Sequence, residues 1–205
     1  MNKMVRVVTN RLIRLSGNLF KMLSYPFHFV FPKLRFTIPE HSPARVQLKQ
    51  QKQIPRIIWQ TNFTAKSTLP VYLNYLFNRL MSLSSEYHYV STEAREVFLK
   101  EHAPKEVYDA YMRLTNGAAQ ADLWRLMVLY TYGGVYMDID ATLVWPLNDI
   151  LKQDTDALYI KVSNNTEITN YFIASKPNNP DLKRAIDQVV HNINNYDPKM
   201  GVYHS

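Results

Sequence analysis

The chain has 205 residues, which is enough for one domain with a sizeable core. Its 46% hydrophobic and 20% charged residues are typical of a globular protein, and 13% aromatic residues exclude an intrinsically disordered chain. The sequence contains no cysteine, which excludes disulfides, thiolate metal sites and a cysteine nucleophile.

The net charge of +7 is distributed unevenly along the chain. Residues 1–53 carry a charge of +9, whereas residues 54–205 carry −2. A nucleic-acid-binding domain usually spreads positive charge over its folded surface, so we expect no nucleic-acid partner. A basic leader on a near-neutral domain instead favours a membrane surface as the partner.

Residues 1–31 are predicted to form a basic amphipathic helix whose pattern ends at Pro26. The longest stretch without Lys or Arg here is 22–32, whereas crossing a bilayer takes roughly 20 apolar residues. We therefore expect the helix to lie among the headgroups of an acidic membrane. A helix packed on its own domain, or a partly disordered tail, is the alternative. The apolar stripe consists of Val5, Val8, Leu12, Leu15, Leu19 and Met22.

A polar linker is expected at 32–53, followed by a single domain at 54–205 in which strands and helices alternate. Strands are expected at 54–60, 87–92, 134–140, 157–162 and 170–176. Helices are expected at 69–83, 93–102, 104–114, 118–132 and 179–193, the last with Asn179 or its neighbour as N-cap. This alternation predicts an α/β domain with a mixed, mainly parallel sheet.

Asp138 and Asp140 end the expected strand 134–140, "GVYMDID", which follows a glycine suited to capping the preceding helix. Ligands of α/β sheets gather at the carboxyl ends of strands, and alternate residues of a strand share a face. Two carboxylates on one face repel each other unless a cation lies between them. The pair therefore predicts a site for Mg²⁺ or Mn²⁺, which prefer oxygen ligands.

Two other interpretations of this motif remain open. A D-x-D pair is short enough to be two ordinary surface acids. "DIDATL" also fits the signature of haloacid dehalogenase phosphatases, with Asp138 as nucleophile and Asp140 as acid/base. That motif normally opens its fold, however, and the residues after Thr142 contain no acidic cluster of the kind these phosphatases need.

The chain contains three informative stretches: "IPRIIWQTN", "AAQADLWRLMVLYTYGGVYMDIDATLVWPLNDIL" and "NYFIASKPNNPDLKRAI". Together they resemble glycosyltransferase family 32, which includes yeast initiating α-mannosyltransferases and bacterial capsule and lipopolysaccharide transferases. The resemblance covers about residues 54–195, and its centre is a long and specific motif.

The resemblance implies a GT-A fold, a Rossmann-like single domain that binds a UDP- or GDP-linked sugar. Asp138 and Asp140 would hold Mn²⁺ or Mg²⁺ against the donor diphosphate, where a cation stabilises the charge left on the leaving group. The implied reaction is sugar transfer with retention to a glycan or lipid-linked acceptor, as in polysaccharide, lipopolysaccharide or glycolipid biosynthesis.

Two further sites follow from the same resemblance. Asp122 and Arg125 match its D-x-x-R, so Asp122 would accept hydrogen bonds from sugar hydroxyls and Arg125 would contact sugar or phosphate. A local ion pair on one helix face is the alternative. Trp59 stands where the family usually has His, and is expected to contact the nucleotide base or to fill the core.

The end of the chain and its location complete the expectations. Compared with the family, the chain is expected to be truncated at its C-terminus, where His204 is a candidate late ligand. We expect a cytoplasmic protein on the inner membrane face, or on a Golgi-type membrane in a eukaryote. The alternative function is an inactive remnant that binds a membrane or partner enzymes.

Overall fold

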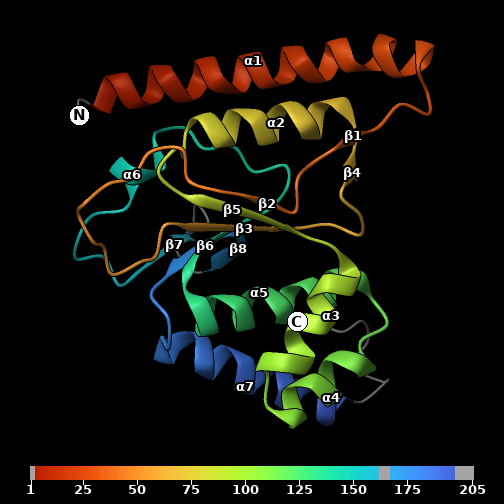
Figure 1. Ribbon diagram of the computed structural model, residues 1–205, viewed down its shortest axis with the longest axis vertical. Helices are drawn as coiled ribbons and strands as arrows, with labels where there is room; N and C mark the ends of the chain where they lie inside the picture. Colours follow the sequence, from red (N-terminus) through yellow and green to blue (C-terminus); the bar gives the residue numbers. More distant parts are fainter. Residues whose placement is uncertain (1–2, 162–166, 197–205) are drawn as a thin grey trace.

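A six-stranded sheet lies between two groups of helices in the computed structural model, which describes residues 3–161 and 167–196 (Figure 1). On one side lie α1 (Lys3–Val30) and α2 (Leu69–Leu80), with the short α6 (Leu147–Ile150) nearby. On the other side lie α3 (Thr92–His102), α4 (Lys105–Arg113), α5 (Gly117–Tyr132) and α7 (Pro180–Asn194).

The sheet is mixed, as expected from the sequence, but parallel pairs do not predominate in it, which corrects the expectation of a mainly parallel sheet. Its order is β2 (His41–Ser42), β5 (Glu86–Val90), β3 (Ile57–Thr61), β6 (Gly134–Met137), β8 (Ile168–Ser175) and β7 (Ala157–Lys161). Only the central strands β5, β3 and β6 run parallel, and every other neighbouring pair is antiparallel. Six residues separate β7 from β8, which is too few for a parallel crossover.

Each face of the sheet has its own core because successive strand residues point to opposite sides. Ile58 and Val135 belong to the cluster on the side of α2, whereas Trp59 and Tyr136 belong to the cluster on the side of α5 and α7. The α5 residue Trp124 is 1% exposed within the second cluster. The central strands are thus covered on both faces and hold their carboxyl ends in fixed positions.

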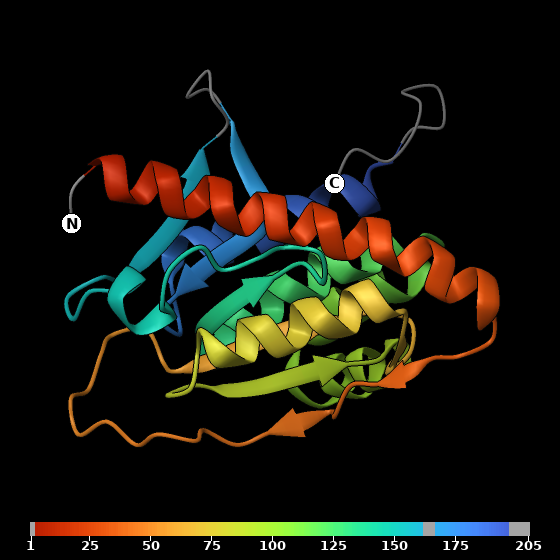
Figure 2. The ribbon, with the colours of Figure 1, turned by 90° about the horizontal axis from the view of Figure 1, so that it is seen from above.

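Helix α1 continues through Pro26 to Val30, four residues beyond the predicted end of its pattern. Contacts near its C-terminus explain the extension. The ring of Phe27 lies 6.2 Å from that of Phe36, and Nε2 of His28 accepts a hydrogen bond from the backbone N–H of Leu69 at 3.1 Å. Figures 1 and 2 show α1 lying alongside α2 on the outside of the domain. Among the described residues, no helix has the length and apolar character needed to span a bilayer.

The segment 32–53, expected to be a linker, contributes to the fold. Strand β2 joins the edge of the main sheet by pairing with β5, and β1 (Phe36–Thr37) pairs with β4 (Lys66–Ser67). Ile38, between β1 and β2, is fully buried. Arg79 of α2 donates a hydrogen bond to the carbonyl of Pro43 at 2.7 Å. Burial of Ile38 stabilises the contact of this segment with the domain, which its polar composition does not predict.

Candidate functional site

An open cavity of about 580 Å³ lies at the carboxyl ends of the three parallel strands. Residues at or just after the ends of β3, β5 and β6 meet there with the N-terminal half of α5. This is where ligands bind in open α/β sheets, and the volume is in the range of small-molecule sites. The cavity is lined by Thr61, Asn62, Phe63, Val71, Thr92, Arg95, Gly117, Ala118, Ala121, Arg125, Tyr136, Asp138, Ile139 and Asp140.

Both aspartates line this cavity, but a turn rather than a strand brings them there. Strand β6 ends at Met137, and the backbone N–H of Ala141 donates to the carbonyl of Asp138 at 2.9 Å. The main chain of Asp138 is held from both sides, by the carbonyl of Tyr171 at 2.9 Å and the side-chain amide of Gln60 at 3.0 Å. The two aspartates therefore share the cavity, as expected, but the alternation of side chains along a strand is not what brings them together.

The entry into β6 requires its two glycines. Gly133 and Gly134 adopt φ values of 66° and 103°, which side chains other than glycine rarely adopt. A Cβ atom on Gly134 would lie 2.6 Å from the carbonyl oxygen of Ile57, and one on Gly133 would lie 2.8 Å from Pro177. Strands β3 and β6 approach each other closely here, which fixes where the aspartates emerge.

Two asparagines of α2 hold the turn that carries Asp140. The amide of Asn74 donates to the carbonyls of Ile139 and Ala141, each at 2.9 Å. Asn78, fully buried, donates to Ala141 and accepts from the backbone N–H of Leu143, again at 2.9 Å. Sequence reasoning missed this pair, although two asparagines four residues apart in an apolar helix are a detectable signal.

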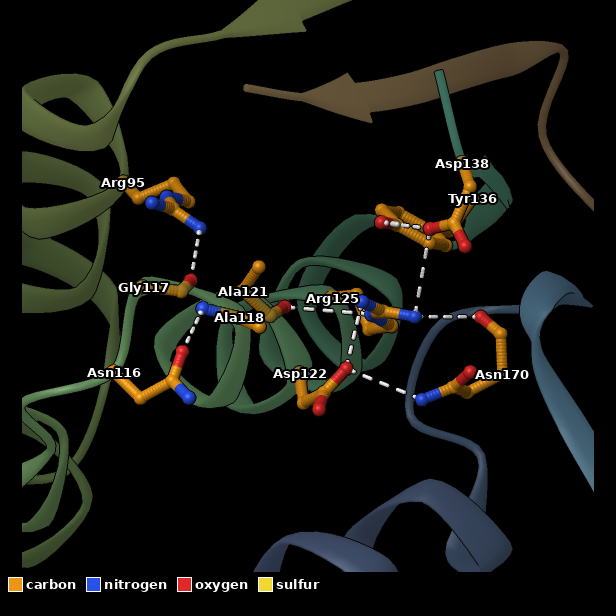
Figure 3. Close-up of polar contacts among 10 residues, drawn as sticks. All are labelled: Arg95, Asn116, Gly117, Ala118, Ala121, Asp122, Arg125, Tyr136, Asp138 and Asn170. Atoms are coloured by element: carbon orange, nitrogen blue, oxygen red, sulfur yellow. Dashed lines mark hydrogen bonds and ion pairs between the residues drawn. The ribbon is translucent and has the colours of Figure 1, made fainter. Parts of the chain in front are cut away.

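Arg125 joins the helix α5 to the aspartate turn (Figure 3). Its Nη2 lies 2.6 Å from Oδ1 of Asp122, and its Nη1 lies 3.7 Å from Oδ1 of Asp138. Nη1 also donates to the carbonyl of Asn170 at 2.7 Å, and the guanidinium stacks over the ring of Tyr136 at 4.3 Å. A buried cation with two carboxylates and a carbonyl has its charge satisfied and its position fixed.

The hydroxyl of Tyr136 donates a hydrogen bond to Oδ1 of Asp138 at 2.7 Å. Burial raises the pKa of Tyr136 well above its ordinary value, and the charge of Asp138 adds to that rise while Arg125 opposes it. The phenol therefore remains a hydrogen-bond donor throughout the neutral range. Among the described residues, both contacts to the carboxylate of Asp138 involve Oδ1, and Oδ2 has none.

Asp122 and Arg125 occupy different positions relative to the cavity. Arg125 lines it, whereas Asp122 pairs with Arg125 and accepts a hydrogen bond from the amide of Asn170 at 3.2 Å. Asp122 is not among the residues that line the cavity. The predicted D-x-x-R pair thus exists as an ion pair, in which Arg125 lines the cavity and Asp122 contacts Arg125.

Arg95 is a second cation at the cavity that sequence reasoning missed. It is 3% exposed, and it donates to the hydroxyl of Thr92 at 2.9 Å and to the carbonyl of Gly117 at 3.3 Å. Its Nε has no hydrogen-bond partner among the described residues, and burial lowers its pKa. An incompletely paired buried guanidinium beside a cavity is suited to an anionic ligand.

Trp59 lies in the core and not at the cavity. It is 8% exposed, its indole N–H donates to the carbonyl of Gly133 at 2.9 Å, and its ring stacks on His88. Of the two roles considered for Trp59, the packing role fits these contacts, and contact with a nucleotide base does not. His204 lies outside the described residues.

Comparison with known proteins identifies the region that carries this site. Residues 70–157 match the family model described as the glycosyltransferase sugar-binding region containing a DXD motif. Together with the relatives described below, this match supports a glycosyltransferase family 32-like assignment. The matched residues include both aspartates, Arg125 and the asparagines of α2. The family resemblance found in the sequence motifs is therefore confirmed.

Two yeast proteins support this family 32-like assignment. An initiation-specific alpha-1,6-mannosyltransferase of Candida albicans is 30% identical over 130 residues, covering 58% of this chain and 34% of the relative. A mannosyl phosphorylinositol ceramide synthase of Saccharomyces cerevisiae is 26% identical over 152 residues, covering 73% of this chain and 39% of the relative. The chain thus spans only a little over a third of the length of these relatives.

The fold agrees with the family 32-like assignment. The solved structure titled "PaToxG Glycosyltransferase" superimposes with a TM-score of 0.54 and 15% identity, over 96% of this chain and 73% of that one. At this identity the likeness concerns the fold alone. The predicted α/β fold of the GT-A type is confirmed.

Proposed function

We propose that this protein transfers a sugar from a nucleotide-sugar donor to a glycan or lipid-linked acceptor, with a divalent cation and retention at the sugar. The observation that carries the proposal is the meeting of Asp138, Asp140 and Arg125 in one cavity at the carboxyl ends of parallel strands. A cation site and a fixed guanidinium in one cleft suit a donor whose leaving group is a diphosphate.

The donor set fits Mn²⁺ or Mg²⁺. Asp138 and Asp140 supply carboxylate oxygens, and among the residues that the structure describes no imidazole lines the cavity. Asp140 is exposed and has no ion-pair partner within the described part of the chain. A bound cation would stabilise the negative charge that develops on the departing nucleoside diphosphate. The protein contributes by holding the turn through Asn74 and Asn78.

The two arginines and the start of α5 supply the remaining positive potential for the donor. Arg95 and Arg125 both line the cavity, as do Gly117 and Ala118 in the first turn of α5, where the helix dipole favours anions. We assign Arg125 to contact with the diphosphate or sugar, and Asp122 to positioning Arg125. Both yeast relatives carry names that denote mannosyl transfer, so nucleotide-linked mannose is the first donor to test.

We further propose that α1 holds the protein on an acidic membrane surface, at the inner membrane face or on a Golgi-type membrane. Its apolar side chains are exposed along most of the helix, although α2 packs beside it. Such a face adjoining basic residues suits the headgroup region. Exposed apolar residues of α1 include Val5, Val8, Leu12, Leu15, Leu19, Met22 and Leu23.

The transfer proposal is tested by incubating the full chain with Mn²⁺ and a panel of UDP- and GDP-linked sugars, and measuring release of nucleoside diphosphate. We expect release from at least one donor, and a loss of 100-fold or more in Asp140→Asn. Asp154→Asn, which changes an exposed acid outside the cavity, is the matched control. Equal rates for Asp140→Asn and the control would overturn the proposal.

Binding measurements separate the transferase from the remaining alternatives. Titration with UDP, GDP and Mn²⁺ should give binding that Asp140→Asn abolishes. Absence of any nucleotide binding would favour a remnant that acts only as a membrane or partner-binding module. Hydrolysis of a phosphomonoester that Asp138→Asn abolishes would favour the phosphatase, which the match to the glycosyltransferase family model does not support.

A further inference from the structure

A second cluster of metal-ligating side chains lies on the edge of the sheet. His41 of β2 pairs directly with His88 of the neighbouring antiparallel strand β5, and Glu86 lies two residues before His88 on the same strand. Cross-strand partners and residues two apart on a strand share one face of the sheet. The three side chains therefore converge on one point from two strands.

The distances within this cluster suit a metal ion. Nε2 of His88 lies 3.4 Å from Oε2 of Glu86, and Nε2 of His41 lies 3.9 Å from the same oxygen. One ligand atom from each residue lies within 4.8 Å of the others. Ligands of a tetrahedral zinc ion at about 2.1 Å lie roughly 3.4 Å apart, so small side-chain rotations would bring all three into range.

The residues behind the cluster hold it in place. The ring of His88 stacks on Trp59, with centroids 4.5 Å apart, and Trp59 is itself fixed by its hydrogen bond to Gly133. His41 and Glu86 remain about half exposed, so an ion and a completing water can reach the site from solvent. Trp59 thus supports the ring of a proposed metal ligand, His88, rather than a ligand in the cavity.

We propose that His41, Glu86 and His88 bind a divalent transition-metal ion such as Zn²⁺, at a site separate from the aspartate cavity. Two imidazoles and one carboxylate are the ligand set that such ions favour, whereas the oxygen set at Asp138 and Asp140 favours Mg²⁺ or Mn²⁺. The ion would tie the two-residue edge strand β2 to β5. It would thereby fasten the segment that joins α1 to the sheet.

The test uses the full chain without a polyhistidine tag, stripped with EDTA and titrated with Zn²⁺ by calorimetry. We expect about one equivalent to bind, with affinity reduced at least tenfold in His41→Ala and in Glu86→Gln, whose side chains are exposed enough to spare the fold. His191→Ala, an exposed histidine on α7, should bind as the wild type does. Binding equal to the wild type in both cluster variants would overturn the proposal.

Two further arms distinguish this site from the donor site. Asp138→Asn should retain the tight Zn²⁺ site, and the loss of that site in Asp138→Asn would overturn the proposal by assigning the ion to the cavity. Co²⁺ should give visible absorption bands of a low-coordinate histidine site in the wild type. Those bands should disappear in His41→Ala, and their persistence would again count against the cluster.

Discussion

Nη1 of Arg125 lies 3.7 Å from Oδ1 of Asp138, although one residue belongs to α5 and the other to the turn after β6. The same guanidinium lies 2.6 Å from Oδ1 of Asp122. Arg125 therefore fixes the aspartate turn against the helix and also keeps one acid of the pair near a positive charge. A cation that binds Asp138 enters a site whose geometry is already set.

Arg125→Lys is expected to lower the free energy of unfolding by about 1–2 kcal/mol, because an ammonium group cannot reproduce the planar fork that contacts two acids and a carbonyl. Part exposure of both acids keeps the loss below that of a fully buried pair. Urea unfolding measures it. Arg184→Lys, which alters an exposed pair with Asp181, is the control and should change stability little. Equal stability of the two variants would contradict the role given to Arg125.

Asn78→Ala should destabilise the fold by about 1–3 kcal/mol, because it leaves the buried N–H of Leu143 without its partner and the carbonyl of Ala141 with Asn74 as its remaining side-chain donor. It should also raise the KM for the donor, since the turn that carries Asp140 loosens. Asn192→Ala, in an exposed pair with Gln188 on α7, provides the comparison. A variant that loses stability but keeps the wild-type KM would show that the turn is held without Asn78.

Gly134→Ala should cost about 2–4 kcal/mol of folding free energy, because the new Cβ would meet the Ile57 carbonyl at 2.6 Å and φ is +103°. Gly17→Ala is the matched substitution, since nothing lies within 4 Å of its Cβ and alanine favours helix α1. Denaturation midpoints of the two variants should move in opposite directions. A Gly134→Ala midpoint equal to that of the wild type would refute the close approach of β3 and β6.

The raised pKa of Tyr136 predicts a specific dependence on pH. The folded state binds this proton more tightly than the unfolded state, so its contribution to stability is complete below about pH 10 and is lost as the pH rises above that value. Other buried tyrosines, including Tyr87 and Tyr111, act in the same direction. From pH 9 upward, the free energy of unfolding should therefore fall less steeply with pH in Tyr136→Phe than in the wild type. Identical slopes would contradict the raised pKa of Tyr136.

Replacing two apolar residues of α1 together, Leu12→Asp and Leu15→Asp, should reduce binding to vesicles that contain phosphatidylserine at least tenfold, since both side chains are exposed and apolar. Val97→Asp, at a similarly exposed apolar position on α3, should bind as the wild type does. Vesicle sedimentation measures the bound fraction. Undiminished binding of the double variant would argue that α1 serves the domain and not a membrane.

Local sequence signals predicted most of the elements and the position of the site. Apolar periodicity placed the helices 118–132 and 179–193 within one residue of their ends, and Asn179 caps the latter by accepting from the N–H of Asp181. The rule that ligands gather at the carboxyl ends of parallel strands placed Asp138 and Asp140 at the cavity.

The features that sequence reasoning missed depend on contacts between distant residues. Arg95 reads as an ordinary helical cation until packing buries it beside Gly117, 22 residues away. The antiparallel half of the sheet follows from strand pairing, which apolar pattern alone does not specify. The place of Ile38 in the core likewise depends on a distant contact, since its backbone N–H donates to the carbonyl of Ala65.

The hydrogen bond between His28 and the first residue of α2 has a geometric consequence. Leu69 begins the helix whose Val71 lines the cavity, so the end of α1 and the cavity both adjoin α2. A helix joined in this way keeps a fixed distance from the cavity, whereas a flexible linker would not. If α1 rests on a bilayer as proposed, the cavity stands at a fixed height above it, and the proposed transfer would select acceptors whose reactive hydroxyl reaches that height.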